Sequence, residues 1–138
     1  MYFSQSDLFW GMSIDFVKSA TDLAVHITCQ EGDKLFDIGD PADRFYVLLK
    51  GSVTMKRGDG KLYTAENAGE IFGWSSLINR EEYAASATCD RVTELLDIKS
   101  GPFLELIEKS QQDKATLFER LARMLGNQLL GVYIAATA

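Results

Sequence analysis

The feature that most constrains the fold is a change of hydrophobic period near residues 24 and 98. Between these positions, short runs rich in β-branched and aromatic residues alternate with turns that contain Gly and Asp, which is typical of short antiparallel strands. Outside them, apolar residues recur at helical spacing. We therefore expect a mainly β structure, a sandwich, barrel or jelly roll, with one helical segment before it and two helices after it.

Seven candidate strands and several corner glycines lie within residues 24–98. The strands are Val25–Cys29, Lys34–Asp37, Arg44–Lys50, Ser52–Arg57, Lys61–Glu66, Tyr83–Cys89 and Val92–Ile98. The glycines at corners, where a tight turn or bulge favours positive φ, are Gly32, Gly39, Gly51 and Gly69. Gly58-Asp59-Gly60 is the clearest hairpin turn. The nearly all-apolar run Phe45–Leu49 predicts a strand that is buried on both faces.

The helical patterns cover residues 7–20, 101–110 and 113–133. Asp7 and Asp113 are candidate caps, and Gly11 allows a break of the first helix into two short ones. The last helix carries an apolar stripe that includes Leu117, Leu121, Met124, Leu125 and Leu129. Either this stripe packs wholly on its own domain, or its far half pairs with a second copy to make a homodimer.

The composition fits one globular domain over residues 1–138, since 46% hydrophobic and 25% charged residues suffice for one core. A net charge of −6 without a Lys/Arg run argues against nucleic-acid binding. The sequence shows no targeting segment and no apolar stretch of about 18 residues, so we predict no membrane contact and a cytoplasmic location. In a reducing compartment, Cys29 and Cys89 are expected to be buried thiols.

Neither a metal site nor a catalytic site is expected. His26 is the only histidine, and strand alternation puts it and Cys29 on opposite faces. A metal-dependent jelly-roll enzyme needs several such ligands together, and a Ser or Cys nucleophile needs a nearby base. The pair Glu81-Glu82 is interpreted as a solvated loop face. We therefore predict that the chain is not an enzyme and has no cofactor.

One segment carries most of the functional information. It reads Gly69-Glu70-Ile71-Phe72-Gly73-Trp74-Ser75-Ser76-Leu77-Ile78 and closes with Tyr83-Ala84-Ala85-Ser86. A strand that ends in Phe-Gly and turns directly into a short helix forms an anion site from backbone N–H groups. Two further motifs precede it, Glu31-Gly32-Asp33-Lys34-Leu35-Phe36 with Gly39-Asp40-Pro41-Ala42-Asp43, and the run Phe45–Val53.

In this order and spacing, the motifs resemble the cyclic nucleotide-binding domain of bacterial catabolite regulators, kinase regulatory subunits and cyclic nucleotide-gated channels, over about residues 8–133. The resemblance implies an eight-stranded β-roll, a double-stranded β-helix of the jelly-roll type, with one helix before it and two after it. It also implies that the helix over residues 113–133 closes over a ligand, and that in the bacterial regulators this helix forms the dimer contact.

The two charged anchors of the family's cassette are replaced. The resemblance implies a Glu after Phe-Gly for the ribose hydroxyl and an Arg before Ala-Ala for the cyclic phosphate, whereas this chain has Trp74 and Tyr83. An indole has no acceptor, and a phenol gives a neutral hydrogen bond of about 1 kcal/mol where an arginine gives roughly 1.5–3 kcal/mol. Loss of both anchors predicts an affinity for cyclic nucleotides lower by roughly two to four powers of ten. Arg80 is an alternative source of positive charge.

The candidate pocket residues are Gly73, Trp74, Ser75, Ser76, Leu77, Tyr83, Ala84, Ala85 and Ser86. Trp74 either fills the cavity or forms a wall on which a flat or apolar ligand stacks. We predict a stand-alone regulatory, ligand-sensing module with altered or lost cyclic nucleotide specificity and a small anionic or flat ligand. The alternatives are a genuine cyclic AMP or cyclic GMP sensor with an unusual pocket, and a ligand-free dimerisation or protein-interaction module.

Overall fold

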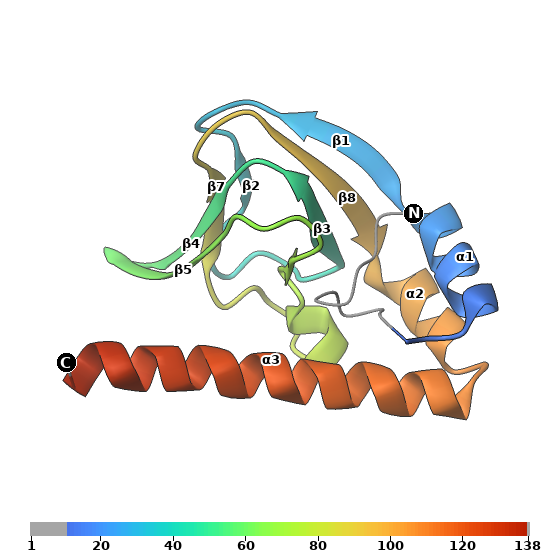
Figure 1. Cartoon of the computed structure of the whole chain (residues 1–138). Helices are drawn as coiled ribbons and strands as arrows, with labels where there is room; N and C mark the ends of the chain where they lie inside the picture. Colours follow the sequence, from blue (N-terminus) through green and yellow to red (C-terminus); the bar gives the residue numbers. More distant parts are fainter. Residues whose placement is uncertain (1–10, 138) are drawn as a thin grey trace.

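The computed structural model describes the backbone of residues 11–137 and the side chains of residues 11–127. Two four-stranded antiparallel sheets form a roll (Figure 1). One sheet has the order β1 (Val25–Cys29), β8 (Thr93–Lys99), β3 (Arg44–Lys50), β6 (Ile71–Phe72). The other has the order β2 (Lys34–Phe36), β7 (Ser86–Cys89), β4 (Val53–Arg57), β5 (Gly60–Ala65). The predicted mainly β, jelly-roll-like fold is confirmed.

Three helices accompany the roll in the described part of the chain. Helices α1 (Ile14–Leu23) and α2 (Ser100–Ile107) lie together at one end, and α3 (Gln111–Thr137) extends along the whole width of the roll (Figure 1). The predicted ranges 101–110 and 113–133 differ from α2 and α3 by a few residues at their ends. This arrangement places α3 beside the roll, where it can contact the segment that follows β6.

Strand β3 separates two hydrophobic cores, as its double-sided burial requires. Tyr46 and Leu48 belong to the core inside the roll, which we call the roll core. Phe45 and Val47 belong to the core shared with the helices, which we call the helix-side core. In the helix-side core, the ring of Phe103 packs edge-to-face on Phe45 with centroids 4.9 Å apart. The predicted strand buried on both faces is therefore confirmed, and it holds the helices against the sheet.

The corner glycines behave as predicted. Positive φ angles are found at Gly32, Gly39, Gly51 and Gly69. Gly51 is the strictest case, because a Cβ atom there would lie 2.7 Å from the Cα atom of Thr93. Any other residue at this corner would force the start of β4 away from β8.

The first helix begins later than predicted. Ser13 caps α1, since its side-chain oxygen accepts a hydrogen bond from the backbone N–H of Phe16 at 3.2 Å. Gly11 precedes this cap with a φ of 81°, which breaks a helix that would continue from upstream. The predicted residues 7–10 and the predicted cap Asp7 lie outside the described residues.

The prediction that Asp113 caps the last helix is wrong. Helix α3 begins at Gln111, and it is the Ser110 hydroxyl that accepts from the backbone N–H of Asp113, at 3.2 Å. The buried Asp113 carboxylate instead accepts hydrogen bonds from the backbone N–H and the hydroxyl of Ser13, at 2.9 and 2.6 Å. Burial acts to raise the pKa of Asp113, but its hydrogen bonds outweigh burial and hold that pKa below the ordinary value. The start of α3 is thereby fixed to the start of α1.

The predicted strand over Tyr83–Cys89 is wrong in its first half, because β7 covers only Ser86–Cys89. The backbone of Tyr83 pairs with the loop after β2 instead. Its N–H donates to the carbonyl of Asp40 and its carbonyl accepts from the N–H of Gly39, both at 2.9 Å. Residues 83–85 are therefore an irregular segment that closes one side of the site described next.

Candidate functional site

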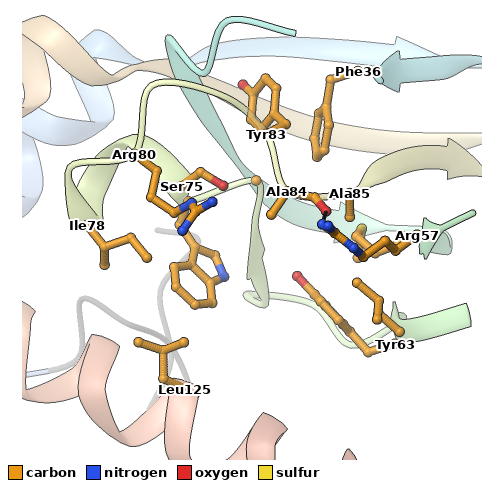
Figure 2. A pocket seen from close by; sticks show the side chains of 14 residues that line it. Phe36, Arg57, Tyr63, Ser75, Ile78, Arg80, Tyr83, Ala84, Ala85 and Leu125 are labelled. Atoms are coloured by element: carbon orange, nitrogen blue, oxygen red, sulfur yellow. Dashed lines mark hydrogen bonds between the residues drawn. The ribbon is translucent and has the colours of Figure 1, made fainter. Parts of the chain in front are cut away.

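A cavity of about 380 Å³ lies between the segment after β6, the strands β4 and β5, and helix α3 (Figure 2). Its lining residues are Phe36, Met55, Arg57, Leu62, Tyr63, Gly73, Trp74, Ser75, Ile78, Arg80, Tyr83, Ala84, Ala85 and Leu125. Six of the nine predicted pocket residues are among them, namely Gly73, Trp74, Ser75, Tyr83, Ala84 and Ala85. The volume is near the lower end of the range of about 300–1,000 Å³ for small-molecule pockets.

The predicted turn from strand to short helix is present. Strand β6 ends at Phe72, and the 3₁₀-helix η1 (Ser75–Ile78) follows almost at once. Gly73 between them has a φ of 69°, and a Cβ atom there would lie 3.0 Å from the ring of Phe36. Only glycine combines this φ with such close packing, so the turn is held tightly over the roll core.

Two predicted residues of η1 face away from the cavity. The hydroxyl of Ser76 is hydrogen-bonded to the hydroxyl of Ser100 at the start of α2. Leu77 is buried in the helix-side core, and its N–H donates to the carbonyl of Trp74 at 3.0 Å. These residues attach η1 to the helices, and neither of them lines the cavity.

Trp74 forms a wall of the cavity. Its side chain is only 8% exposed and belongs to the helix-side core, together with Leu117 and Leu121 of α3. The cavity nevertheless remains open beside it, so the indole does not fill the pocket. Trp74 thus borders an open space, and its role as a wall on which a flat or apolar ligand stacks stays a prediction.

Tyr83 is part of the fold. Its ring stacks on that of Phe36 with centroids 3.9 Å apart, and its hydroxyl donates to the backbone carbonyl of Arg44 at 2.6 Å. Burial raises the pKa of Tyr83 to about 12, so the phenol is neutral near pH 7. Figure 2 shows the hydroxyl on the side of the ring away from Arg57 and Arg80. The only proton of this hydroxyl is thus used within the protein.

Ser86, the last predicted pocket residue, lies outside the cavity. Its hydroxyl oxygen accepts from the N–H of Ile38 at 3.1 Å and donates to the carboxylate of Asp37 at 3.3 Å. The resemblance implied that this hydroxyl could donate to a ligand. In the structure it holds the turn that follows β2.

The charge of the cavity comes from two arginines, one of which the sequence analysis missed. Arg57 of β4 donates to the backbone carbonyl of Ala84 at 2.9 Å, and Arg80 follows η1 (Figure 2). Strand alternation contained a signal for Arg57, because Val53 and Met55 precede it on the buried face of β4. No Asp or Glu is among the described lining residues, although the whole chain has a net charge of −6.

Helix α3 is buried in its first part and contacts the cavity further along. Leu117 and Leu121 are 0% and 1% exposed in the helix-side core, so these two predicted residues cannot contact a second copy. Met124 packs partly on the same core, while Leu125 lines the cavity and is 40% exposed. The side chain of Leu129 lies outside the described residues.

The structure also shows where the histidine and the cysteines lie that were considered as metal ligands or nucleophiles. Among the described residues, no three or more His, Cys, Asp or Glu side chains gather as a metal site would require. His26 is exposed with its Nε2 3.2 Å from a Glu94 carboxylate oxygen, whereas Cys29 is buried, so they face opposite sides as predicted. Cys89 is also a buried free thiol, and burial raises its pKa to about 11. None of the described helices has the length and apolar character needed to cross a bilayer.

Taken together, the roll, the Phe-Gly turn into η1 and the cavity beside α3 define a β-roll domain with a candidate ligand cavity among the described residues. The profile of the family described as "Cyclic nucleotide-binding domain" matches residues 26–110, which is more than half of the chain. The chain therefore belongs to the cyclic nucleotide-binding domain family, as its motifs predicted.

Its relatives include regulators and one enzyme. The N-terminal domain of a transcriptional regulator from Streptomyces coelicolor superposes with a TM-score of 0.71 at 26% identity, covering 87% of this chain and 89% of that chain. The Cyclic AMP receptor protein of Thermus thermophilus is 30% identical over 87% of this chain and 57% of that protein. Glutaminase 1 of Bradyrhizobium diazoefficiens is 24% identical over 92% of this chain and 21% of that protein. The chain thus spans just over half of one curated relative and about a fifth of the other.

Proposed function

We propose that this domain is a regulatory, ligand-sensing module, not a catalyst, whose cavity does not select cyclic nucleotides and whose α3 responds to a different small ligand. The observation that carries the proposal is the pair of altered anchors. The cavity presents an indole at position 74 where the family resemblance implies a carboxylate. At position 83, the phenol that replaces an arginine donates its proton to the carbonyl of Arg44.

A cyclic nucleotide would lose most of its specific contacts in this cavity. Its ribose hydroxyl needs an acceptor, and Trp74 offers only a donor. Its phosphate would have to be held by Arg57 and Arg80, which enter the cavity from sites other than position 83. Removing two anchors worth roughly 1.5–3 kcal/mol each weakens binding by about two to four powers of ten if neither arginine replaces them.

The response of α3 follows from the two parts of that helix. Its start is fixed by Asp113 and by the buried Leu117 and Leu121, whereas Leu125 is half-exposed at the cavity. A ligand that covers Leu125 stabilises the arrangement in which α3 lies against the cavity. Because a ligand shifts a two-state element only through unequal affinity for its states, occupancy then changes the position of α3.

Calorimetry and thermal-shift measurements with cyclic AMP, cyclic GMP and cyclic dinucleotides test the proposal. We expect dissociation constants for the two mononucleotides well above the micromolar range. A Trp10→Phe variant leaves Trp74 as the sole tryptophan, so its fluorescence reports the cavity directly. Micromolar binding of cyclic AMP, with a change in Trp74 fluorescence, would overturn the proposal and favour a genuine cyclic nucleotide sensor.

A specific observation also supports a homodimer through α3. Phe118, Ala122 and Leu125 recur at four- and three-residue steps, so they form an exposed stripe beside the buried one. The ring of Phe118 is 38% exposed, and contact between such a large apolar ring and water is unfavourable. We propose that a second copy of the chain covers the part of this stripe that precedes the cavity residue Leu125, namely Phe118 and Ala122.

Sedimentation of Phe118→Glu against the unchanged chain tests the homodimer. A charge within the proposed contact should raise the dimer dissociation constant at least roughly tenfold. Arg123→Gln is the matched control, because Arg123 is exposed on the same helix and pairs with Glu119 at 3.2 Å. A monomer at every concentration for all three proteins would contradict the dimer.

A further inference from the structure

The ligand class can be argued from the hydrogen-bonding character of the cavity, on the assumption that the proposed function holds. Arg57, Arg80 and Trp74 line the cavity, and all three have side chains that only donate hydrogen bonds. Ser75 and Tyr63 add hydroxyls that can donate or accept. The cavity therefore matches a ligand whose polar atoms are acceptors.

The two arginines are also not neutralised by the protein. Within the described residues, neither guanidinium forms an ion pair, and the hydrogen bond of Arg57 goes to a neutral carbonyl. Figure 2 shows Arg57 and Arg80 extending from opposite sides of the cavity toward its middle. An anionic group placed between them would receive charge-assisted hydrogen bonds from both.

The remaining walls are apolar and largely aromatic. Rings and aliphatic side chains come from every side of the cavity, namely Phe36, Met55, Leu62, Tyr63, Trp74 and Leu125. Such walls accept a ring better than a sugar, because most of these side chains offer no hydrogen-bond partner to a buried sugar hydroxyl. The volume of about 380 Å³ has room for one or two fused rings that carry an acidic group.

We propose that the cavity binds a planar aromatic carboxylate, with its ring against Trp74 and its carboxylate between Arg57 and Arg80. A carboxylate in the plane of its ring keeps the whole ligand flat, so that the ring can lie against the indole of Trp74 while the carboxylate points to the arginines. A tetrahedral phosphate does not lie flat, and it has more oxygens to satisfy in a cavity whose Arg57 already donates to Ala84.

Calorimetry with benzoate, indole-3-carboxylate and 2-naphthoate tests this class, with methyl 2-naphthoate and 2-naphthyl phosphate as comparison ligands. We expect at least one acid to bind, and its neutral ester to bind at least about tenfold more weakly. Arg57→Gln and Arg80→Gln should each raise the dissociation constant of that acid by about ten- to a hundredfold. Arg123→Gln lies outside the cavity and should leave the dissociation constant unchanged.

The outcomes separate the ligand class from the proposed function. Equal binding of acid and ester, tighter binding of the phosphate, or no binding by any of the acids overturns the aromatic carboxylate. Only micromolar binding of a cyclic mononucleotide overturns the proposed function. Both arginines are exposed, and a melting temperature within a few degrees of the unchanged chain confirms that a weaker binder is still folded.

Discussion

Positions 74 and 83 both hold an aromatic ring where the family resemblance implies a charged anchor, but the two rings lie in different surroundings. Tyr83 belongs to the roll core, where it stacks on Phe36 and donates its proton to Arg44. Trp74 belongs to the helix-side core and borders an open cavity beside α3. The two aromatic side chains thus have different surroundings: Tyr83 is held by contacts within the fold, whereas Trp74 borders the space that the proposed ligand would occupy.

Removing the ring of Tyr83 tests most directly whether this side chain stabilises the fold. Tyr83→Ala should lower the free energy of unfolding by about 3–5 kcal/mol, because it deletes a buried, stacked ring and leaves the Arg44 carbonyl without its donor. Urea denaturation measures the loss. Tyr63→Ala is the matched control, since Tyr63 lines the same cavity but is only half-buried, and it should cost clearly less. Equal losses would mean that Tyr83 has no special structural role.

The second prediction concerns helix α3, which packs on the same core as Trp74 and is held at its start by Asp113. Asp113→Ala should cost about 1.5–3 kcal/mol, since it removes charge-assisted hydrogen bonds from Ser13 to a buried carboxylate. The folded pKa of Asp113 lies below its unfolded value of 3.8, so its contribution is full above that pH and disappears as pH falls further. Urea denaturation at pH 7 and pH 3 measures both effects.

Gln112→Ala is the control for this variant, because Gln112 is an exposed neighbour in the same helical turn. It should change the free energy of unfolding by less than about 0.5 kcal/mol. An Asp113→Ala variant as stable as this control would show that α3 is held mainly by Leu117 and Leu121, and that the contact with Ser13 contributes little.

Tyr83 and Asp113 also show which features of the structure could be predicted from the sequence and which could not. Most of the strands, the corner glycines, the double burial of Phe45–Leu49 and the turn at Phe72-Gly73 follow from local patterns and were predicted. The carboxylate of Asp113 binds a residue 100 positions away, and the hydroxyl of Tyr83 binds one 39 positions away. No local pattern encodes such pairs, so Asp113 was interpreted as a cap and Tyr83 as part of a strand.

The cavity was predictable in outline only, for the same reason. Six of nine predicted residues line it, because the cassette is a continuous segment. Arg57 comes from β4, and only the pairing of β4 with β7 brings it next to Ala84. Ser76 and Ser86 have hydroxyls suited to a ligand, but tertiary contacts with Ser100 and Asp37 use them. The residue types indicated which functional groups could bind a ligand, and the tertiary contacts determined which of these groups line the cavity.

The third prediction uses alkaline pH to test the buried phenol of Tyr83, and its expected effect is smaller. The folded pKa of about 12 exceeds the unfolded value of 10, so the contribution of Tyr83 is full below pH 10 and is lost as pH rises toward 12. At pH 11 the loss should be about 1.4 kcal/mol for the unchanged chain relative to Tyr83→Phe, which has no phenol to ionise at this position. Burial, the largest cause of the raised pKa of Tyr46, acts in both proteins and cancels, whereas the smaller charge interaction of Tyr46 with Tyr83 is present only in the unchanged chain. Parallel pH profiles would show that Tyr83 is accessible to hydroxide in the folded state.

The smallest effect separates the two positions most cleanly. At pH 7, Tyr83→Phe should cost about 1 kcal/mol, because it removes one hydrogen bond and keeps the stacked ring. The same variant should leave the dissociation constant of 2-naphthoate unchanged, since the lost hydroxyl is directed at Arg44 and away from the cavity. Trp74→Phe should instead change that dissociation constant, because the indole is the cavity wall. Calorimetry on both variants decides the matter: a Tyr83→Phe variant that loses affinity without losing stability would place its hydroxyl on the ligand and reverse the roles assigned to the two rings.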